Sequence, residues 1–193
     1  MSLSDALKGS RELAGRIATT AQGVAFPASD RARLSAALMD QVHEHHESIR
    51  LLIEKDLVGS AFALVRITFE NAVRGIWLFR CASDDELEQF KADRLEKHFG
   101  ELVALVERFV GAPGTALSQA KTRFWGPMCS YAHGGYLQAV RRISATEIGP
   151  NYSEEEQIGV LSFANFCLLV VSVELCSLAG RDDLANSIAQ FPI

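Results

Sequence analysis

The stretch LVGSAFALVRITFENAVRGIWLFRCA, residues 57–82, carries apolar side chains at intervals of three and four, which is the period of an α-helix. Leu64 and Leu78 lie on one flank of this predicted helix, and Val65 and Phe69 lie on another. A helix that is apolar on more than one side must be covered by neighbouring elements. The sequence therefore predicts that this helix lies at the centre of the fold.

The same helical period recurs along nearly the whole chain, whereas strand-like alternation is absent. We therefore predict an all-α fold, with residues 1–193 as a single domain. Four long helices are expected to form an antiparallel helical bundle, and short helices close its ends. The predicted helices cover residues 3–22, 30–55, 58–81, 84–110, 115–125, 127–144 with a break near Gly134, 154–179 and 182–190.

The composition describes an acidic protein with a formal net charge of −5 and a pI near 5.5. As a whole it does not attract nucleic acid or an anionic membrane, so any such contact needs a local basic patch. Its cysteines are far apart in the sequence and form no CxxC pair, which indicates reduced thiols. Charges near the N-terminus interrupt any apolar signal segment, and we expect a cytoplasmic protein.

The most apolar predicted helix follows Ser153 and Glu156, which have the spacing of a capping box. Residues 157–173 contain no charged side chain, but Ser162 and Asn165 interrupt this segment. It is also shorter than the roughly 20 apolar residues that cross a membrane. We interpret it as a buried bundle helix and expect no membrane contact.

Arg66, Glu70 and Arg74 are spaced four residues apart on the central helix and form one stripe, with Trp77 beside them. One interpretation is a solvated face with two weak ion pairs. The alternative is a buried ladder that lines a polar cavity, because apolar residues surround the stripe and buried charges must be paired. In that arrangement Glu70 orients two guanidinium groups, whose spare N–H groups can bind a carboxylate, a phosphate or a base edge.

The predicted helix 30–55 contains the segment HEHHE. Its apolar positions place His45 in the middle of the inward face, His46 on the border of that face and His43 on the outside. His45 is either a hydrogen-bonded core residue or part of a site that faces the stripe. An exposed pair such as His43 and Glu47 supplies too few ligands for a closed metal site, so we predict neither a metal nor another cofactor.

The segment SYAHGG, residues 130–135, interrupts the helical pattern. Pro127 suits the first turn of a short helix, and Gly134 can adopt the left-handed conformation that ends one. His133 is then either a helix C-cap or a site residue that acts as acid or base on a phosphodiester, with the Tyr131 hydroxyl beside it. The arginines that would form a local basic patch around it are Arg123, Arg141 and Arg142.

The segments ALVRITFENAVRGIWL (63–78) and FWGPMCSYAHGG (124–135) together resemble a bacterial family of uncharacterised helical proteins. That family has an R-x3-E-x3-R-x2-W helix and a later W-x4-S-Y/T-x-H-G-G segment. It is distantly similar to HEPN-like proteins (higher eukaryote and prokaryote nucleotide-binding), which are small helical bundles that commonly dimerise and include toxin and defence ribonucleases. The resemblance implies a HEPN-like bundle with these shared positions: Arg66, Glu70, Arg74, Trp77, Trp125, Tyr131, His133, Gly134 and Gly135.

HEPN ribonucleases have four to six residues between an arginine and the histidine that follows it, and this chain has no clear copy of that motif. Arg94 and His98 are one residue too close together, whereas Arg123 and His133 are too far apart. The resemblance therefore carries the shared positions but no activity.

Two functions fit these residues. In the first, a polar pocket binds or cleaves nucleotide or RNA in a stress or phage-defence setting, by a ribonuclease-like reaction that needs no metal. Its proton-transfer residues would be His133, Glu70 and His45, and its ligand-binding residues Arg66, Arg74, Tyr131, Trp77 and Arg141. In the second, the chain is a non-catalytic binding module whose polar residues fix the bundle and whose His133 only caps a helix. We expect a homodimer in both cases, because several helices are apolar on more than one face.

Overall fold

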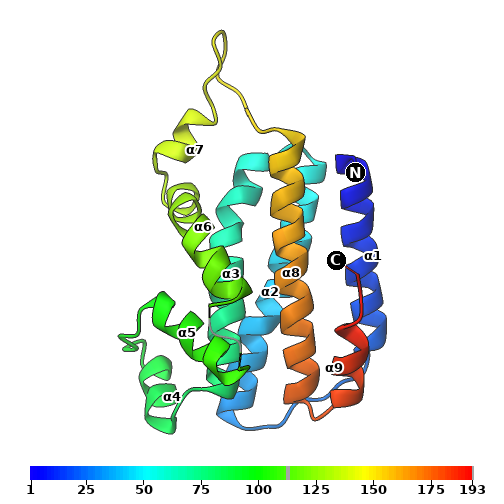
Figure 1. Cartoon of the computed structure of the whole chain (residues 1–193), viewed down its shortest axis with the longest axis vertical. Helices are drawn as coiled ribbons and strands as arrows, with labels where there is room; N and C mark the ends of the chain where they lie inside the picture. The colour runs from blue at the N-terminus through cyan, green and yellow to red at the C-terminus, as the bar shows by residue number, and fades with distance from the viewer. Residues whose placement is uncertain (112–113, 193) are drawn as a thin grey trace.

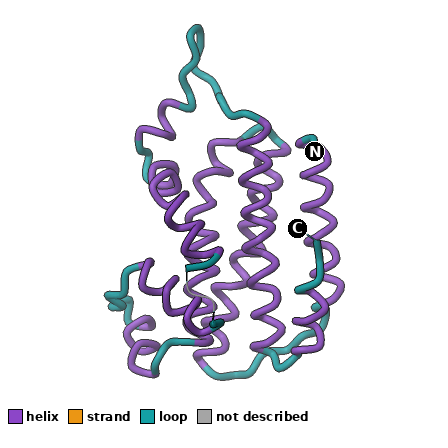
Figure 2. The backbone as a smooth tube through the Cα atoms, in the orientation of Figure 1, coloured by secondary structure: helices purple, strands orange, loops and turns teal. Residues whose placement is uncertain are grey.

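The computed structural model describes residues 1–111 and 114–192, which form α-helices and no β-strand (Figure 2). The all-α prediction is confirmed. Figure 1 shows how the helices are arranged. In chain order they are α1 (Leu3–Thr20), α2 (Asp30–Glu54), α3 (Val58–Arg80), α4 (Asp84–Lys91), α5 (Phe99–Phe109), α6 (Ala116–Ala132), α7 (Tyr136–Val140), α8 (Glu154–Leu178) and α9 (Asp182–Ile188).

The body of the molecule is a bundle of the four long helices α1, α2, α3 and α8, with α4 to α7 as a side arm along α3 (Figure 1). α2 runs antiparallel to α8, because His46 contacts Asn165 whereas the earlier His43 contacts the later Ser172. A short loop joins α2 to α3, and these two helices are also antiparallel (Figure 1).

The sequence analysis predicts an antiparallel bundle. This prediction is wrong for one pair of long helices, because α3 and α8 run in the same direction. The rings of Phe69 and Phe163 have centroids 5.3 Å apart, and Arg80 Nε donates to Glu174 Oε2 at 2.8 Å. Arg80 lies eleven residues after Phe69 on α3, and Glu174 lies eleven residues after Phe163 on α8, so the two helices advance together. The physical reason is the long connection through α4 to α7, which returns the chain to the end where α3 begins (Figure 1).

Two predicted helix boundaries differ from the structure. The segment predicted as one helix, 84–110, is divided into α4 and α5, and Asp93 takes a left-handed φ of 53° just after α4 ends. Conversely, α6 continues through Pro127, where the sequence predicts that a new helix begins. Proline removes one helical hydrogen bond to the carbonyl of Arg123. Both residues are exposed, so water can satisfy that carbonyl.

The prediction that α3 is the central helix is confirmed. Phe69, Val73 and Trp77 are fully buried, and residues of α3 pack against α2, α5, α6 and α8. Gly75 faces α2, where a Cβ would lie only 2.6 Å from Met39 Cγ. The missing side chain at this position therefore allows the two helices to approach closely.

The predicted capping box begins α8. Ser153 Oγ accepts a hydrogen bond from the Glu156 backbone N–H at 3.2 Å, and Glu156 Oε2 accepts from the Ser153 N–H at 2.9 Å. Within the described part of the chain, α8 alone is long and apolar enough to cross a membrane. The core helix of a bundle meets the same criterion, and α8 packs against α1, α2, α3 and α9.

Candidate functional site

Arg66 is the centre of a polar cluster that joins α3 to α6. Its Nε donates to Glu70 Oε1 at 2.9 Å, its Nη1 contacts His133 Nε2, and its guanidinium carbon lies 4.9 Å from the ring centroid of Trp125. A guanidinium group donates hydrogen bonds but accepts none, so His133 Nε2 is the acceptor in this contact. We call these four residues the Arg66 cluster.

Trp125 fixes the position of the guanidinium group by stacking. Phe99, the first residue of α5, stacks on Trp125 with ring centroids 4.4 Å apart and planes inclined by 13°. Since Phe99 covers one face of the indole, Arg66 lies over the other. A cation–π contact of this kind contributes about 0.5–1 kcal/mol at a site that water can reach. Trp125 is not among the predicted ligand-binding residues, because its spacing from Arg66 in the sequence gives no sign of this contact.

The segment 130–135 explains how His133 reaches Arg66. His133 is the C-cap of α6, and Gly134 follows with a left-handed φ of 67°. The Gly135 N–H then donates to the Ser130 carbonyl at 2.7 Å, and a Cβ at Gly135 would lie 2.5 Å from Ser130 Oγ. Both glycines are therefore required by the turn. The predicted C-cap is confirmed, and the same turn places the imidazole against α3.

The stripe on α3 is half-buried, in contrast to the predicted buried ladder. The side chains of Arg66 and Glu70 are each 21% exposed, and they form one ion pair. Arg74 is also half-buried but makes no hydrogen bond or ion pair with any residue that the structure describes. The ladder is thus a single pair with an unpaired arginine one turn further along.

His45 does not join the Arg66 cluster. It lies on α2, and α2 packs against the side of α3 that carries Asn71 and Gly75. At about 100° per residue, that side is roughly opposite the one that carries Arg66 and Glu70. The predicted proton-transfer pair of His45 and His133 is therefore not supported, since α3 separates the two histidines.

The inward face of α2 is also rotated from the prediction. His46, predicted on its border, is 1% exposed, whereas His45 is half-buried. The small residues Ala32, Ser35 and Ala36 turn a different face of α2 toward its neighbours from the one predicted from its leucines. Burial lowers the pKa of both imidazoles; Glu44 opposes this effect at His45, and the Asn165 hydrogen bond and Glu47 oppose it at His46.

Trp77, a predicted ligand-binding residue, is 0% exposed in the core and cannot contact a ligand. Trp77 follows Arg74 by three residues, which places it near the stripe of Arg66, Glu70 and Arg74, but the side arm covers that end of α3. The indole N–H of Trp77 has no hydrogen-bond partner among the described residues.

Tyr131 and Arg141 belong to a second cluster next to the first. Tyr131 is buried and packs edge-on against Phe62 at 5.1 Å between ring centroids. Arg141 forms an ion pair with Glu156 and lies over Tyr152 at 5.8 Å. These contacts tie the side arm to the start of α8, so both predicted ligand-binding residues are engaged in packing.

The Arg66 cluster has the chemistry of an anion site. A guanidinium group has five N–H donors, and Arg66 uses Nε on Glu70 and one Nη1 hydrogen on His133. The donors on Nη2 have no acceptor in the part of the chain that the structure describes. Residues 1–111 and 114–192 contain no group of three histidine, cysteine, aspartate or glutamate side chains placed to hold a metal ion. The four cysteines, all within these residues, form no disulfide.

One comparison with known proteins found a match to a family model. Residues 39–192 match the model of a family described as a family of unknown function, DUF6988. A search of curated proteins and a search of solved structures each found no match. The matched residues include α3, α6 and the whole Arg66 cluster. Since the match covers most of its length, the chain belongs to the DUF6988 family.

Proposed function

We propose that the Arg66 cluster binds a phosphate group of a nucleotide or of RNA. The observation that carries the proposal is the convergence of Glu70, Trp125 and His133 on one arginine that keeps free N–H donors. An arginine held in place by three groups loses little further freedom when it binds an anion. Its planar fork matches two phosphate oxygens.

The surroundings supply further positive charge. Arg74 lies two helical turns from Arg66, about 12 Å along α3, and has no partner in the described chain. Arg142 and Gly134 both line a cavity at the start of α3, so a further arginine lies near the His133 turn. These residues form the local basic patch that an acidic protein needs.

We propose binding as the main function, in place of cleavage. A phosphodiester reaction by general acid and base catalysis uses two proton-transfer groups. His133 lies in the cluster, but the second predicted histidine, His45, lies on the opposite side of α3. The remaining partner, Glu70, is held by Arg66 at 2.9 Å.

The proposal includes a HEPN-like relationship and a homodimer in the cytoplasm. Its support is the helical bundle, the two sequence motifs and apolar side chains on the surface. Ile67, next to Arg66, is exposed, as are Leu51 in the last turn of α2 and Leu57 on the α2–α3 connection. Such side chains favour association of two copies.

Isothermal titration with mononucleotides and a short single-stranded RNA tests the proposal. The Arg66→Lys variant keeps the positive charge but loses the fork, so affinity should fall by about tenfold or more. Arg33→Lys, at an exposed position of α2, is the matched control and should bind like the wild type.

Two results decide against the proposal. One is a wild-type protein that binds none of these ligands at low salt, where phosphate contacts are strongest. The other is unchanged affinity in the Arg66→Lys variant. If RNA is cleaved and His133→Ala abolishes cleavage without weakening binding, the cluster is catalytic.

A further inference from the structure

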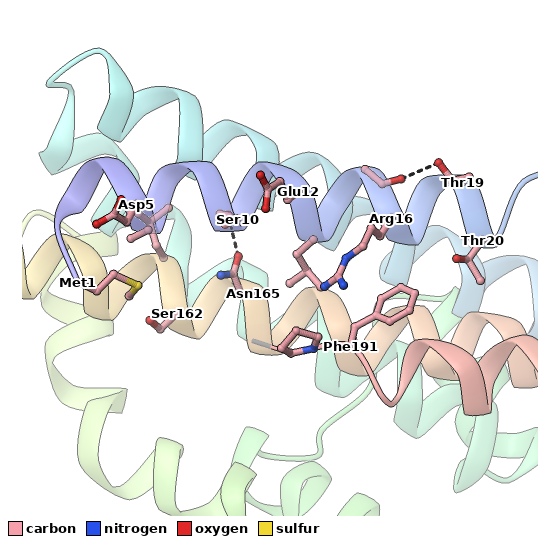
Figure 3. Close-up of a pocket in the computed structure, with 16 residues that line it drawn as sticks. Met1, Asp5, Ser10, Glu12, Arg16, Thr19, Thr20, Ser162, Asn165 and Phe191 are labelled. Carbon is pink, nitrogen blue, oxygen red and sulfur yellow. Dashed lines mark hydrogen bonds between the residues drawn. The ribbon is translucent and has the colours of Figure 1, made fainter.

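A cavity of about 930 Å³ lies between α1, α8 and the C-terminal segment (Figure 3), and α1 is on the side of the bundle away from α6 (Figure 1). We call it the α1–α8 groove. Its walls include Leu13 and Leu161, and Phe191 lies at its mouth. The volume is typical of a small-molecule site. The groove runs along most of α1, which favours an elongated ligand.

The floor of the groove is a buried hydrogen-bonded network of three residues, Ser10, His46 and Asn165. Ser10 Oγ donates to Asn165 Oδ1 at 2.7 Å, and His46 Nε2 lies 2.9 Å from the same oxygen and 3.0 Å from Ser10 Oγ. Ser10 and His46 are 0% and 1% exposed, and Asn165 is nine-tenths buried. Both contacts hold the amide oxygen of Asn165, so its Nδ2 group is turned away from them.

Asn165 Nδ2 has no hydrogen-bond partner in the part of the chain that the structure describes, although Asn165 lines the groove. Figure 3 shows its side chain reaching across from α8 toward Ser10. Nδ2 is not enclosed by protein, so the solvent in the groove reaches it. An acceptor oxygen on a ligand in the groove can therefore bind to this donor.

Gly9 and Gly15 keep the groove wide. A glycine inside a helix is less stable than an alanine by roughly 1 kcal/mol. At both positions a Cβ would meet no atom within 4 Å, so packing within the chain does not require glycine. Both residues line the groove, and larger side chains there would fill it. Two helical glycines are therefore explained by the space that they leave.

Arg16 supplies a positive charge at the groove. Its guanidinium carbon lies 4.6 Å from the Phe191 ring centroid, and Figure 3 shows both side chains in the space between α1 and α8. Arg16 forms no ion pair with any described residue. Two acids also line the groove: Glu12 lies 3.9 Å from Lys8, and Asp5 accepts hydrogen bonds from Ser2. Arg16 is therefore the lining side chain that can bind an anionic ligand group.

We propose that the groove binds an N-acyl amino acid, a small molecule with an apolar tail, an amide carbonyl and a carboxylate. The tail lies against Leu13 and Leu161, the carbonyl accepts from Asn165 Nδ2, and the carboxylate accepts from Arg16. Asn165 lies beside Ser10, to which it is hydrogen-bonded, and positions 10 and 16 of α1 are about 9 Å apart along the helix axis. An amide and a carboxylate separated by one carbon span a comparable distance, since each hydrogen bond adds about 3 Å.

The carboxylate is tested with two ligands that differ only there. Isothermal titration of the full chain with N-decanoylglycine should give saturable binding, and N-decanoylglycinamide should bind about tenfold more weakly. Arg16→Gln should remove the difference between the two ligands. Arg33→Gln, on the exposed side of α2, is the matched control and should preserve it.

The space is tested by filling it. Gly9→Leu should weaken N-decanoylglycine binding by about tenfold or more without lowering the melting temperature, since leucine is the better helix former. Gly159→Leu is the matched control. Gly159 is also a helical glycine with no atom within 4 Å of a Cβ, but it lies on α8 outside the groove lining.

Equal affinity of the two ligands for the wild type overturns the proposal, as does undiminished binding to the Gly9→Leu variant. It is also overturned if N-decanoylglycine does not bind and Gly9→Leu converts a dimer to a monomer in light scattering, because a second copy then occupies the groove. Arg66→Lys should leave N-decanoylglycine binding unchanged. The groove and the Arg66 cluster can therefore fail independently.

Discussion

The Arg66 cluster and the buried network of Ser10, His46 and Asn165 are built in the same way but differ in burial. Each joins polar side chains from helices that are far apart in the sequence. The network is largely shielded from water, with exposures of 0% for Ser10, 1% for His46 and 9% for Asn165, whose amide faces the α1–α8 groove. In the Arg66 cluster the arginine and glutamate side chains are each 21% exposed.

Because the two regions differ in burial, we expect substitutions in them to have different effects. When a member of a buried network is removed, its partners lose their hydrogen bonds and water cannot replace them. When a member of a half-exposed cluster is removed, water takes its place. Loss of a network residue should therefore cost more stability than loss of a residue of the Arg66 cluster.

The largest expected effect follows from breaking the network. Asn165→Leu leaves Ser10 and His46 buried without their common acceptor, and we expect the free energy of unfolding to fall by about 2–4 kcal/mol. Urea denaturation followed by circular dichroism measures it. Asn186→Leu, at an exposed position of α9, is the control and should change stability by less than about 0.5 kcal/mol. A loss below about 1 kcal/mol for Asn165→Leu would mean that the network is not shielded from water.

A smaller effect is expected from acid. Burial lowers the pKa of His43, His45 and His46 from the ordinary value, so their folded pKa lies below their unfolded pKa of about 6.5. Below pH 6.5 the unfolded chain then binds more protons than the folded chain. The stability that these groups contribute is complete above pH 6.5 and is lost as the pH falls toward the folded values.

Between pH 7.5 and pH 5.5 the free energy of unfolding should therefore fall by about 1–2 kcal/mol. His46→Gln removes the most buried imidazole and should flatten this dependence, although it lowers stability at pH 7.5. Urea midpoints measured across this range test the sign. Stability that increases toward pH 5.5 would show that these histidines gain protons on folding.

The sequence predicts the helices well because their signals are local. The helical period of α3 and the capping box of α8 depend on neighbouring residues, and both predictions are confirmed. The direction of α8 relative to α3 depends on where a side arm of about seventy residues ends, which no local pattern encodes. The continuous helix through Pro127 depends on solvent access to a single carbonyl, which is also a tertiary property.

The candidate site is predictable only where one helix or one turn carries it. The Arg66–Glu70 pair follows from its spacing, and the C-cap at His133 follows from the glycines after it. The contact of Arg66 with His133 and Trp125 depends on the angle at which α6 crosses α3. The error at His45 has a different origin, since the face that a helix buries depends on its neighbours as well as on its own apolar residues.

The smallest effect on stability is expected in the Arg66 cluster, for which we propose phosphate binding. Arg66→Ala breaks an ion pair whose partners are one-fifth exposed and a contact with Trp125, and we expect a loss of up to about 1 kcal/mol. Glu70→Ala should cost no more, because Arg66 keeps its contacts with His133 and Trp125. Urea denaturation of both variants beside Asn165→Leu places the two regions on one scale. If Arg66→Ala destabilises the protein as much as Asn165→Leu does, the cluster is a structural network like the first, and the distinction between the two regions fails.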